Sequence, residues 1–228
     1  YVAEYTIKLK VYKKEGLNWG SIKIPYYVGY KELEKDRLEI KRAFTYNLDN
    51  GKVVKERVTS DGKLLEKENS KWETRIVTFP NVKPGSIIEL QYIIKSDDIA
   101  SIDLFRMQSE IPVNEAFLQT AIPAFYVYKV IKSGYLDMAI NQKVEPGYIN
   151  FSAKNGSYGM SSDQSLTFNN VVSTFYMEGI PALKEEKYSA MKKDYFSAVS
   201  LELERTQFPN EEPKQIAGTW EDVSKTIY

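Results

Sequence analysis

Residues 86–95 read Ser-Ile-Ile-Glu-Leu-Gln-Tyr-Ile-Ile-Lys, and this stretch decides the fold class. Apolar side chains stand at positions 88, 90, 92 and 94, while polar or charged ones stand at 89, 91 and 95. A strand places successive side chains on opposite faces, so this period of two predicts a β-strand with one face in a core and the other in water. The residues before it, 80–85, form a compact turn signal with two prolines and a glycine.

The same period recurs along the chain. Tyr5, Ile7, Leu9 and Val11 fall on one face of a predicted strand. In residues 38–48 the even positions are apolar apart from Arg42, and an Asn-Gly pair follows, so 38–58 is predicted to be a long hairpin with these even positions on one face. Further strands are predicted at 21–28, 72–79, 102–110, 116–122, 125–131, 148–153, 165–168 and 195–204.

About ten short strands joined by turns indicate an all-β fold, a large antiparallel β-sandwich. Pro25 lacks an N–H donor and favours an edge position for its strand. Helical periodicity is scarce: residues 185–193 are compatible with a turn or two of helix, and Thr219 is a candidate N-cap for a partial helix over 219–228. We therefore expect a β-sandwich domain over residues 1–205, followed by a linker and the start of a connection over 206–228.

The composition excludes several classes of function. The 228 residues include 31 Lys plus Arg and 31 Asp plus Glu, and this neutral balance argues against a nucleic-acid partner. The chain has neither Cys nor His. It therefore has no thiol nucleophile, thiolate metal site or Ser-His-Asp triad, although carboxylate-pair and Ser–Lys chemistry remain possible. These absences favour a domain that does not itself catalyse.

No apolar run approaches the roughly 18–20 residues that a membrane-spanning helix needs, so a membrane-spanning protein is not expected. The densest apolar stretch, residues 121–131, is interrupted by Pro123 and Lys129. The chain begins at Tyr1 rather than Met, as expected either of a mature form after removal of a signal peptide or of a trimmed domain.

Three stretches together resemble a known family. Residues 80–92 read Pro-Asn-Val-Lys-Pro-Gly-Ser-Ile-Ile-Glu-Leu-Gln-Tyr and resemble the signature of the bacterial family DUF3857. Residues 105–123, with Ile-Pro-Val at 111–113 and Ile-Pro at 122–123, and residues 179–186, Gly-Ile-Pro-Ala-Leu-Lys-Glu-Glu, support the resemblance. It covers the chain to about Leu203.

The resemblance implies a context. In that family the domain precedes a transglutaminase-like, papain-fold domain in periplasmic or secreted envelope proteins, often of the Bacteroidetes. Such an enzyme needs a Cys nucleophile, a His base and an orienting Asp. Because this chain has no Cys and no His, the resemblance implies a catalytic partner domain downstream in the same polypeptide.

Aromatic side chains are the leading candidates for a binding surface. The candidates lie near polar or turn residues and are Trp19, Tyr26, Tyr27, Tyr30 and Trp72. Exposed rings can stack on sugars or pack on a partner, but ordinary sandwich core and cross-strand contacts explain most such rings. Asp97 and Asp98 are read as a solvated turn, and no spacing selects a carboxylate pair, a metal site or a cofactor site.

Three hypotheses follow for function. The first is a non-catalytic β-sandwich module that packs against a transglutaminase-like domain and shapes access to its cleft. The second is a free-standing module that binds a glycan or a peptide through its aromatic residues. The third is a carboxylate-based hydrolase.

Overall fold

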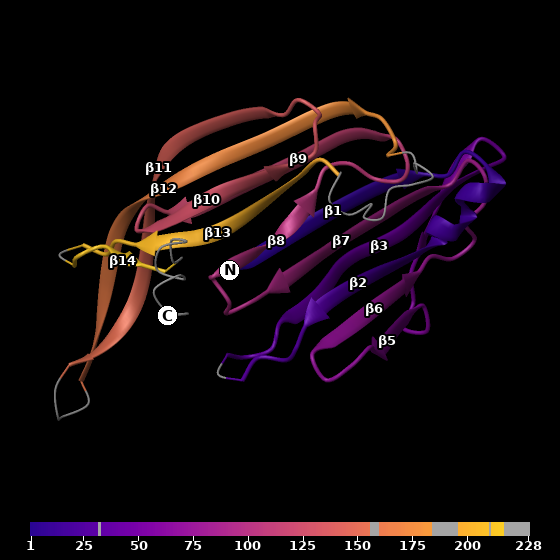
Figure 1. Ribbon diagram of the computed structural model, residues 1–228. Helices are drawn as coiled ribbons and strands as arrows, with labels where there is room; N and C mark the ends of the chain where they lie inside the picture. The colour runs from indigo at the N-terminus through magenta and orange to yellow at the C-terminus, as the bar shows by residue number, and fades with distance from the viewer. Residues whose placement is uncertain (32, 156–159, 184–195, 210, 217–228) are drawn as a thin grey trace. The chain divides into compact units, whose positions relative to one another are not determined.

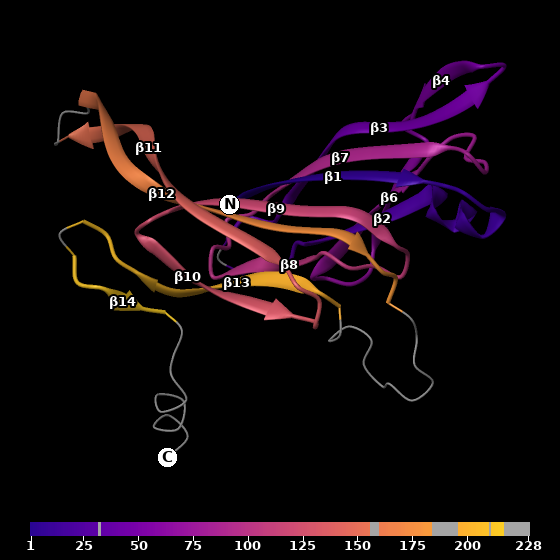
Figure 2. The same cartoon turned by 90° about the horizontal axis from the view of Figure 1, so that it is seen from above.

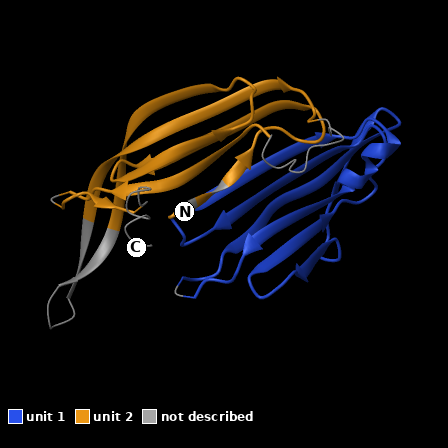
Figure 3. Cartoon of the chain, viewed as in Figure 1, with its two compact units in different colours: residues 1–99 blue, residues 100–228 orange. Residues whose placement is uncertain are grey.

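The computed structural model describes residues 1–31, 33–155, 160–183, 196–209 and 211–216. The chain divides into two compact units, Tyr1–Ile99 and Ala100–Tyr228 (Figure 3). Every strand pair described is antiparallel. The prediction of an all-β antiparallel sandwich is thus confirmed, with the sheets distributed over two units. The predicted domain boundary at 205/206 stays a prediction.

The first unit contains two sheets, of four strands in the order β1-β7-β3-β4 and of three strands in the order β2-β6-β5 (Figure 1). Its strands are β1 (Val2–Lys10), β2 (Ser21–Tyr27), β3 (Arg37–Asp49), β4 (Lys52–Arg57), β5 (Lys63–Lys67), β6 (Trp72–Thr78) and β7 (Ile87–Lys95). A 3₁₀-helix, η1 (Lys14–Gly20), connects β1 to β2. Strand β2, which contains Pro25, lies at a sheet edge as predicted.

The core of the first unit lies between its two sheets, which appear as separate layers in Figure 2. Ile24 from β2 and Val77 from β6 belong to the same buried cluster as Ile88 and Leu90 from β7. Ile88, Leu90 and Val77 are fully buried. The alternation that predicted β7 is therefore the pattern by which this sheet fills the sandwich core.

Strand β3 contains a β-bulge. Ile40 pairs with Tyr92 of β7 and Arg42 pairs with Gln91, so Lys41 is an extra residue between two consecutive pairs. One extra residue shifts the alternation of side chains by one position along the rest of the strand.

Because of the bulge, the prediction that the even positions of 38–48 all lie on one face is wrong. Before it, Leu38 and Ile40 pack against the core; after it, the buried positions are Ala43, Thr45 and Asn47. The rings at positions 44 and 46, which the period of two placed with Leu38, instead lie on the opposite, solvent-facing side of the sheet.

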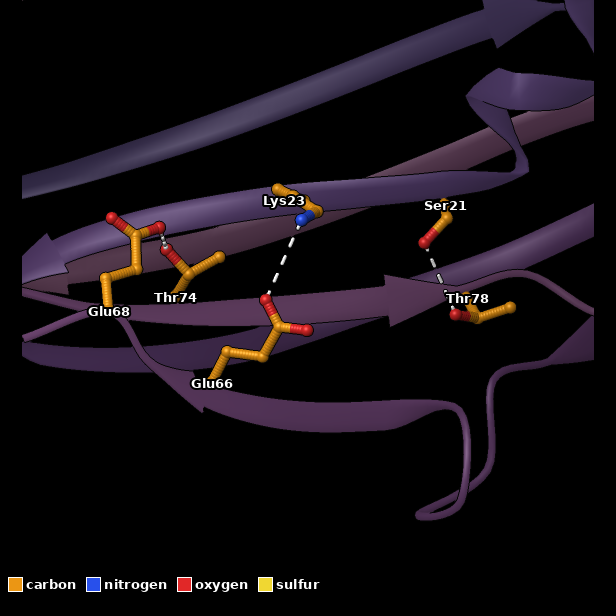
Figure 4. Close-up of polar contacts among 6 residues, drawn as sticks. All are labelled: Ser21, Lys23, Glu66, Glu68, Thr74 and Thr78. Atoms are coloured by element: carbon orange, nitrogen blue, oxygen red, sulfur yellow. Dashed lines mark hydrogen bonds and ion pairs between the residues drawn. The ribbon is translucent and has the colours of Figure 1, made fainter.

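The three-stranded sheet carries polar contacts on its solvent-facing side (Figure 4). Lys23 of β2 forms an ion pair with Glu66 of β5 at 3.7 Å. The Thr74 hydroxyl of β6 donates a hydrogen bond to Glu68 Oε1 at 2.5 Å. Thr74 is buried although it lies on the same face of the sheet as Lys23.

The second unit also contains two sheets. Its strands are β8 (Ser101–Arg106), β9 (Val113–Pro123), β10 (Tyr126–Ser133), β11 (Ala139–Asn155), β12 (Met160–Ile180), β13 (Ala198–Thr206) and β14 (Lys214–Gln215). One sheet has the order β11-β12-β9; in the other, β13 pairs with β10, β14 and β8. Phe175 of β12 and Val199 of β13 share the core cluster between the sheets.

Strands β11 and β12 form a long hairpin that the sequence predicted only in short pieces, 148–153 and 165–168. They have 17 and 21 residues and lie side by side in Figures 1 and 2. Much of the described hairpin is exposed, including Val144 and Tyr148. Without burial of one face the sequence is not driven to alternate, so periodicity gave little signal in the exposed part of the hairpin.

Part of the predicted linker packs on the second unit. Strand β14 pairs with the end of β13, and Phe208 stacks on Phe125 with ring centroids 5.0 Å apart. The helical turns expected at 185–193 and 219–228 lie outside the described residues. Among the helices of the described ranges, none has the length and apolar character needed to cross a membrane.

Candidate functional site

All five predicted aromatic residues lie in the first unit, and three of them form a group of rings in contact. We call these three, Tyr27, Tyr30 and Trp72, the aromatic trio. Tyr27 and Trp72 are opposite each other on β2 and β6, with ring centroids 5.1 Å apart in a T-shaped contact. Tyr30 makes a second T-shaped contact with Tyr27 at 4.6 Å. Edge-to-face geometry of this kind stabilises aromatic pairs beyond the area that they bury.

The backbone around the trio fixes where these rings lie. Val28 N donates a hydrogen bond to Lys71 O at 2.8 Å, which continues the pairing of β2 with β6 past Tyr27. Gly29 lies so close to Lys71 that a Cβ would stand 2.6 Å from its Cγ, so a side chain is excluded there. Trp72 is 39% exposed and the two tyrosines are half-buried. The trio is thus a pre-formed, partly exposed ring surface.

Tyr26, predicted to belong to an aromatic surface, lies in the core. Neighbouring residues of a strand point to opposite faces, so Tyr26 faces inward where Tyr27 faces outward. It is 7% exposed, and its hydroxyl donates a hydrogen bond to Glu73 Oε2 at 2.8 Å. Burial, and then the hydrogen bond to Glu73, raise the pKa of the Tyr26 phenol above its ordinary value.

Trp19 is also separate from the trio. It lies in η1, before β2 begins, whereas Tyr27 is the last residue of β2. Seven strand residues at roughly 3.3 Å each put about 20 Å between them. Trp19 is half-buried. The structure thus brings Tyr27, Tyr30 and Trp72 together and leaves Tyr26 and Trp19 apart; a ligand for the trio stays a prediction.

A second candidate site, not predicted from the sequence, lies on the solvent-facing side of the four-stranded sheet. It is a groove of about 730 Å³, and we call it the basic groove. Its lining consists of Lys8, Lys41, Arg42, Phe44, Tyr46, Val53, Lys55, Arg57, Ile87 and Glu89. Basic residues outnumber acidic ones by five to one in this lining.

Two aromatic rings hold one cation in the basic groove. The Lys55 ammonium lies 3.9 Å from the centroid of the Phe44 ring and 5.3 Å from that of Tyr46. These distances are those of a cation–π interaction. The Tyr46 hydroxyl donates a hydrogen bond to Glu89 Oε2 at 2.5 Å, so the acidic residue of the lining already has a donor.

The bulge explains why sequence reasoning missed the basic groove. Without it, Phe44 and Tyr46 would share a face with Leu38 and would be assigned to the core. Arg42, the charged residue that interrupted the apolar row, was the signal that the phase changes at this point.

The residues that resemble the family signature are structural. Ser86, fully buried, donates its hydroxyl to Asn47 Oδ1 at 2.5 Å and accepts from Lys83 N at 2.8 Å. Asn47 Nδ2 donates in turn to Asn81 O at 3.0 Å. Asn81 and Gly85 both have positive φ, which these residue types tolerate. This network closes the turn from β6 to β7.

A similar polar clamp joins the other two family-like stretches in the second unit. Gln108, 2% exposed, donates from Nε2 to Pro181 O at 3.0 Å and accepts from Ser197 N at 3.2 Å. The side chain satisfies backbone groups that would otherwise be buried without partners. All three stretches therefore serve the framework, and no reacting group is assembled at them within the described residues.

Carboxylates give no metal site in the described part of the chain, where no group of three or more potential ligands gathers. Asp98 N donates to Ser96 Oγ at 3.2 Å, a local turn of the kind expected for the Asp97–Asp98 pair.

A crystal structure from Parabacteroides distasonis, described as that of a "putative protease", matches with a TM-score of 0.61 and 14% identity. The match covers 90% of this chain and 37% of that one, so this chain spans well under half of that protein; the likeness concerns the fold. No curated protein matches. The model of the family "Domain of Unknown Function with solved-structure structure (DUF3857)" matches residues 2–156, about two thirds of the sequence, and the chain therefore belongs to the DUF3857 family.

Proposed function

We propose that this chain is a non-catalytic module of an exported bacterial transglutaminase-like protein. In this proposal it packs against a Cys–His–Asp domain of the same polypeptide and shapes access to the cleft of that domain. The observation that carries it is the fold match to 37% of a longer chain described as a "putative protease", by a sequence with neither Cys nor His.

Two buried serine hydroxyls support a framework role. Without His, a serine nucleophile would need a lysine or carboxylate base in contact with it. Ser86 is committed to the turn network, and Ser197 Oγ is fully buried with no hydrogen-bond partner. A group buried to this degree does not meet a substrate, so neither serine is a candidate nucleophile.

The test measures turnover by the 228-residue chain and by the full gene product. We expect no hydrolysis of labelled casein and no transfer of a fluorescent amine to casein by the chain alone. We expect the full protein to show one of these activities, and a variant lacking residues 1–205 to have an altered KM. Turnover by the chain alone, or a gene product without a Cys–His–Asp domain, would overturn the proposal.

A location in the envelope, periplasmic or secreted, is part of the same proposal. Cell fractionation with an antibody against the chain tests it. Recovery of the protein with cytoplasmic markers would contradict this part.

The aromatic trio favours a second candidate function, binding of a glycan or a peptide. Partly exposed rings in fixed geometry are suited to stacking on such ligands. The test is a fluorescence titration of the chain with cell-wall glycans and peptides, with Trp72→Phe as the variant and Trp19→Phe as the matched control. A saturable response lost only in Trp72→Phe would support it, and no response to any ligand would refute it.

A further inference from the structure

We propose that the basic groove binds an extended acidic peptide whose side chains alternate between carboxylates and apolar groups. This inference goes beyond the proposed function, because it requires no catalytic domain and concerns a different surface from the aromatic trio.

Charge is the first argument. The chain as a whole is neutral, with 31 basic and 31 acidic residues, so the excess of cations in the groove is a local feature. Lys41 is paired with Glu39 at 2.6 Å. Among the described residues, no ion pair joins the other four basic side chains of the lining to an acid; these are Lys8, Arg42, Lys55 and Arg57. They are available to an anionic ligand.

The register of the sheet shows how far these cations extend. Lys8 pairs with Glu89, Glu89 with Phe44, and Phe44 with Arg57, so one row crosses all the strands of the sheet. At about 4.8 Å per strand, the backbones carrying Lys8 and Arg57 are roughly 14 Å apart. Lys55 and Arg57 on β4 are therefore the cations nearest the open edge of the sheet, and Lys8 is the farthest from it.

The rings and apolar residues distinguish a peptide from an acidic polysaccharide. The Lys55 ammonium covers one face of the Phe44 ring at 3.9 Å, so that face is occupied by a cation. Ile87 and Val53, which also line the groove, are 41% and 70% exposed. Val54, next to Lys55 on β4, points to the opposite side of the sheet and is 40% exposed. An extended peptide with carboxylates facing the groove places its alternate, apolar side chains beside Val54, as a polyuronate does not.

The position of β4 gives the peptide a place to lie. β4 is the last strand of its sheet, and no described strand pairs with its outer edge. Lys55 and Arg57 are two residues apart on β4 and face the same side. A peptide that adds to this edge as a strand would have carboxylates at alternate positions on the side of Lys55 and Arg57.

The experiment measures fluorescence anisotropy of a labelled (Glu-Val)4 peptide with the 228-residue chain. We expect saturable binding that weakens as salt rises from 20 to 200 mM, since the contacts are largely ionic. The K55E/R57E variant should lose about tenfold or more in affinity. K8E, at the other end of the row, should weaken binding much less, because its strand lies about 19 Å from a strand added to the β4 edge. K23E, an exposed charge reversal on the other sheet of the unit, is the matched control and should bind as the wild type does.

Four outcomes would overturn the proposal. The first is unchanged affinity in K55E/R57E that retains the wild-type circular dichroism spectrum. The second is equal binding of (Glu)4(Val)4, which has the same composition without the alternation. The third is equal or tighter binding of polygalacturonate, which would identify a polysaccharide ligand. The fourth is a dimer of the chain that K55E/R57E dissociates, which would identify a second copy as the occupant.

Discussion

The two faces of the four-stranded sheet use the same strands in opposite ways. On the inner face Ile88 and Leu90 are fully buried, whereas Ile87, next to Ile88 in sequence, is 41% exposed on the outer face. The inner face holds apolar core together with the Ser86 turn network. The outer face holds cations and rings. In this unit, therefore, apolar residues on the inner face stabilise the fold, whereas those on the outer face belong to a candidate binding surface.

The largest expected effect is a difference in the free energy of unfolding between variants of two neighbouring isoleucines. Ile88→Ala should lower the free energy of unfolding by about 2–5 kcal/mol, because it removes buried methyl groups and leaves a cavity. Ile87→Ala should lower it by less than about 1 kcal/mol, because its side chain is partly in water. Urea denaturation followed by circular dichroism measures both. Equal losses would show that the two faces are not distinguished by burial.

The second effect concerns the polar part of the inner face. Ser86→Ala should cost about 1–3 kcal/mol of unfolding free energy, because Asn47 Oδ1 and Lys83 N would lose their partner. Ser21→Ala is the control, since its hydroxyl is exposed and 3.4 Å from Thr78 Oγ1 (Figure 4). It should change stability by less than about 0.5 kcal/mol. A control loss as large as that of Ser86→Ala would count against the turn network.

The third effect is the pH dependence of the free energy of unfolding, which a buried residue of the core controls. The pKa of Tyr26 is raised in the folded state, mainly by burial, so the neutral phenol stabilises the fold. This contribution is fully present below the unfolded pKa of about 10 and is lost as pH rises through the higher folded pKa. Wild type should therefore lose stability more steeply than Tyr26→Phe above pH 10. Tyr26→Phe itself should cost about 1 kcal/mol at neutral pH.

Glu73→Gln separates the two causes of that shift. Because burial is the larger cause and the substitution keeps Tyr26 buried, most of the steep alkaline loss should remain. Urea titrations at a series of pH values measure it. A Glu73→Gln profile as flat as that of Tyr26→Phe would show that the hydrogen bond, rather than burial, dominates.

The smallest effect belongs to the solvent-facing side of the other sheet. The Lys23–Glu66 ion pair is 3.7 Å long and both side chains are more than half exposed. Breaking it with Glu66→Ala should change the free energy of unfolding by about 0–1 kcal/mol, less at high salt. A double-mutant cycle with Lys23→Ala measures the coupling. A coupling energy above about 2 kcal/mol would contradict the interpretation of this ion pair as a solvent-exposed one.

The sequence predicted those elements in which burial imposes a pattern. Ile88 and Leu90 alternate with polar residues, and β7 was found with nearly its observed limits. The signature turn before it was found from its prolines and glycine. The long hairpin of β11 and β12 was found only in pieces. Much of the described part of β11 is exposed, whereas the second half of β12, which includes Phe175 and Met177, was missed although it is buried.

The candidate sites were less predictable, for physical reasons. Tyr26 and Tyr27 are alike in sequence, and only their phase on β2 decides that one lies in the core and the other in the aromatic trio. The basic groove depends on residues from four strands, and pairing between distant strands cannot be read from local spacing. The composition gave no sign of the basic groove either, because a net charge of zero does not show how the charges are distributed over the surface.

Lys41, which has no partner strand residue in the ladder, decides which residues of β3 face the core and which face water. If Lys41 instead took a regular place in the ladder, Phe44 and Tyr46 would turn into the sandwich and Thr45 and Asn47 would turn to water. The ring-bound ammonium and the turn that depends on Asn47 would then vanish together. One inserted position thus links the integrity of the signature loop to the existence of a cationic surface on the far side of the sheet.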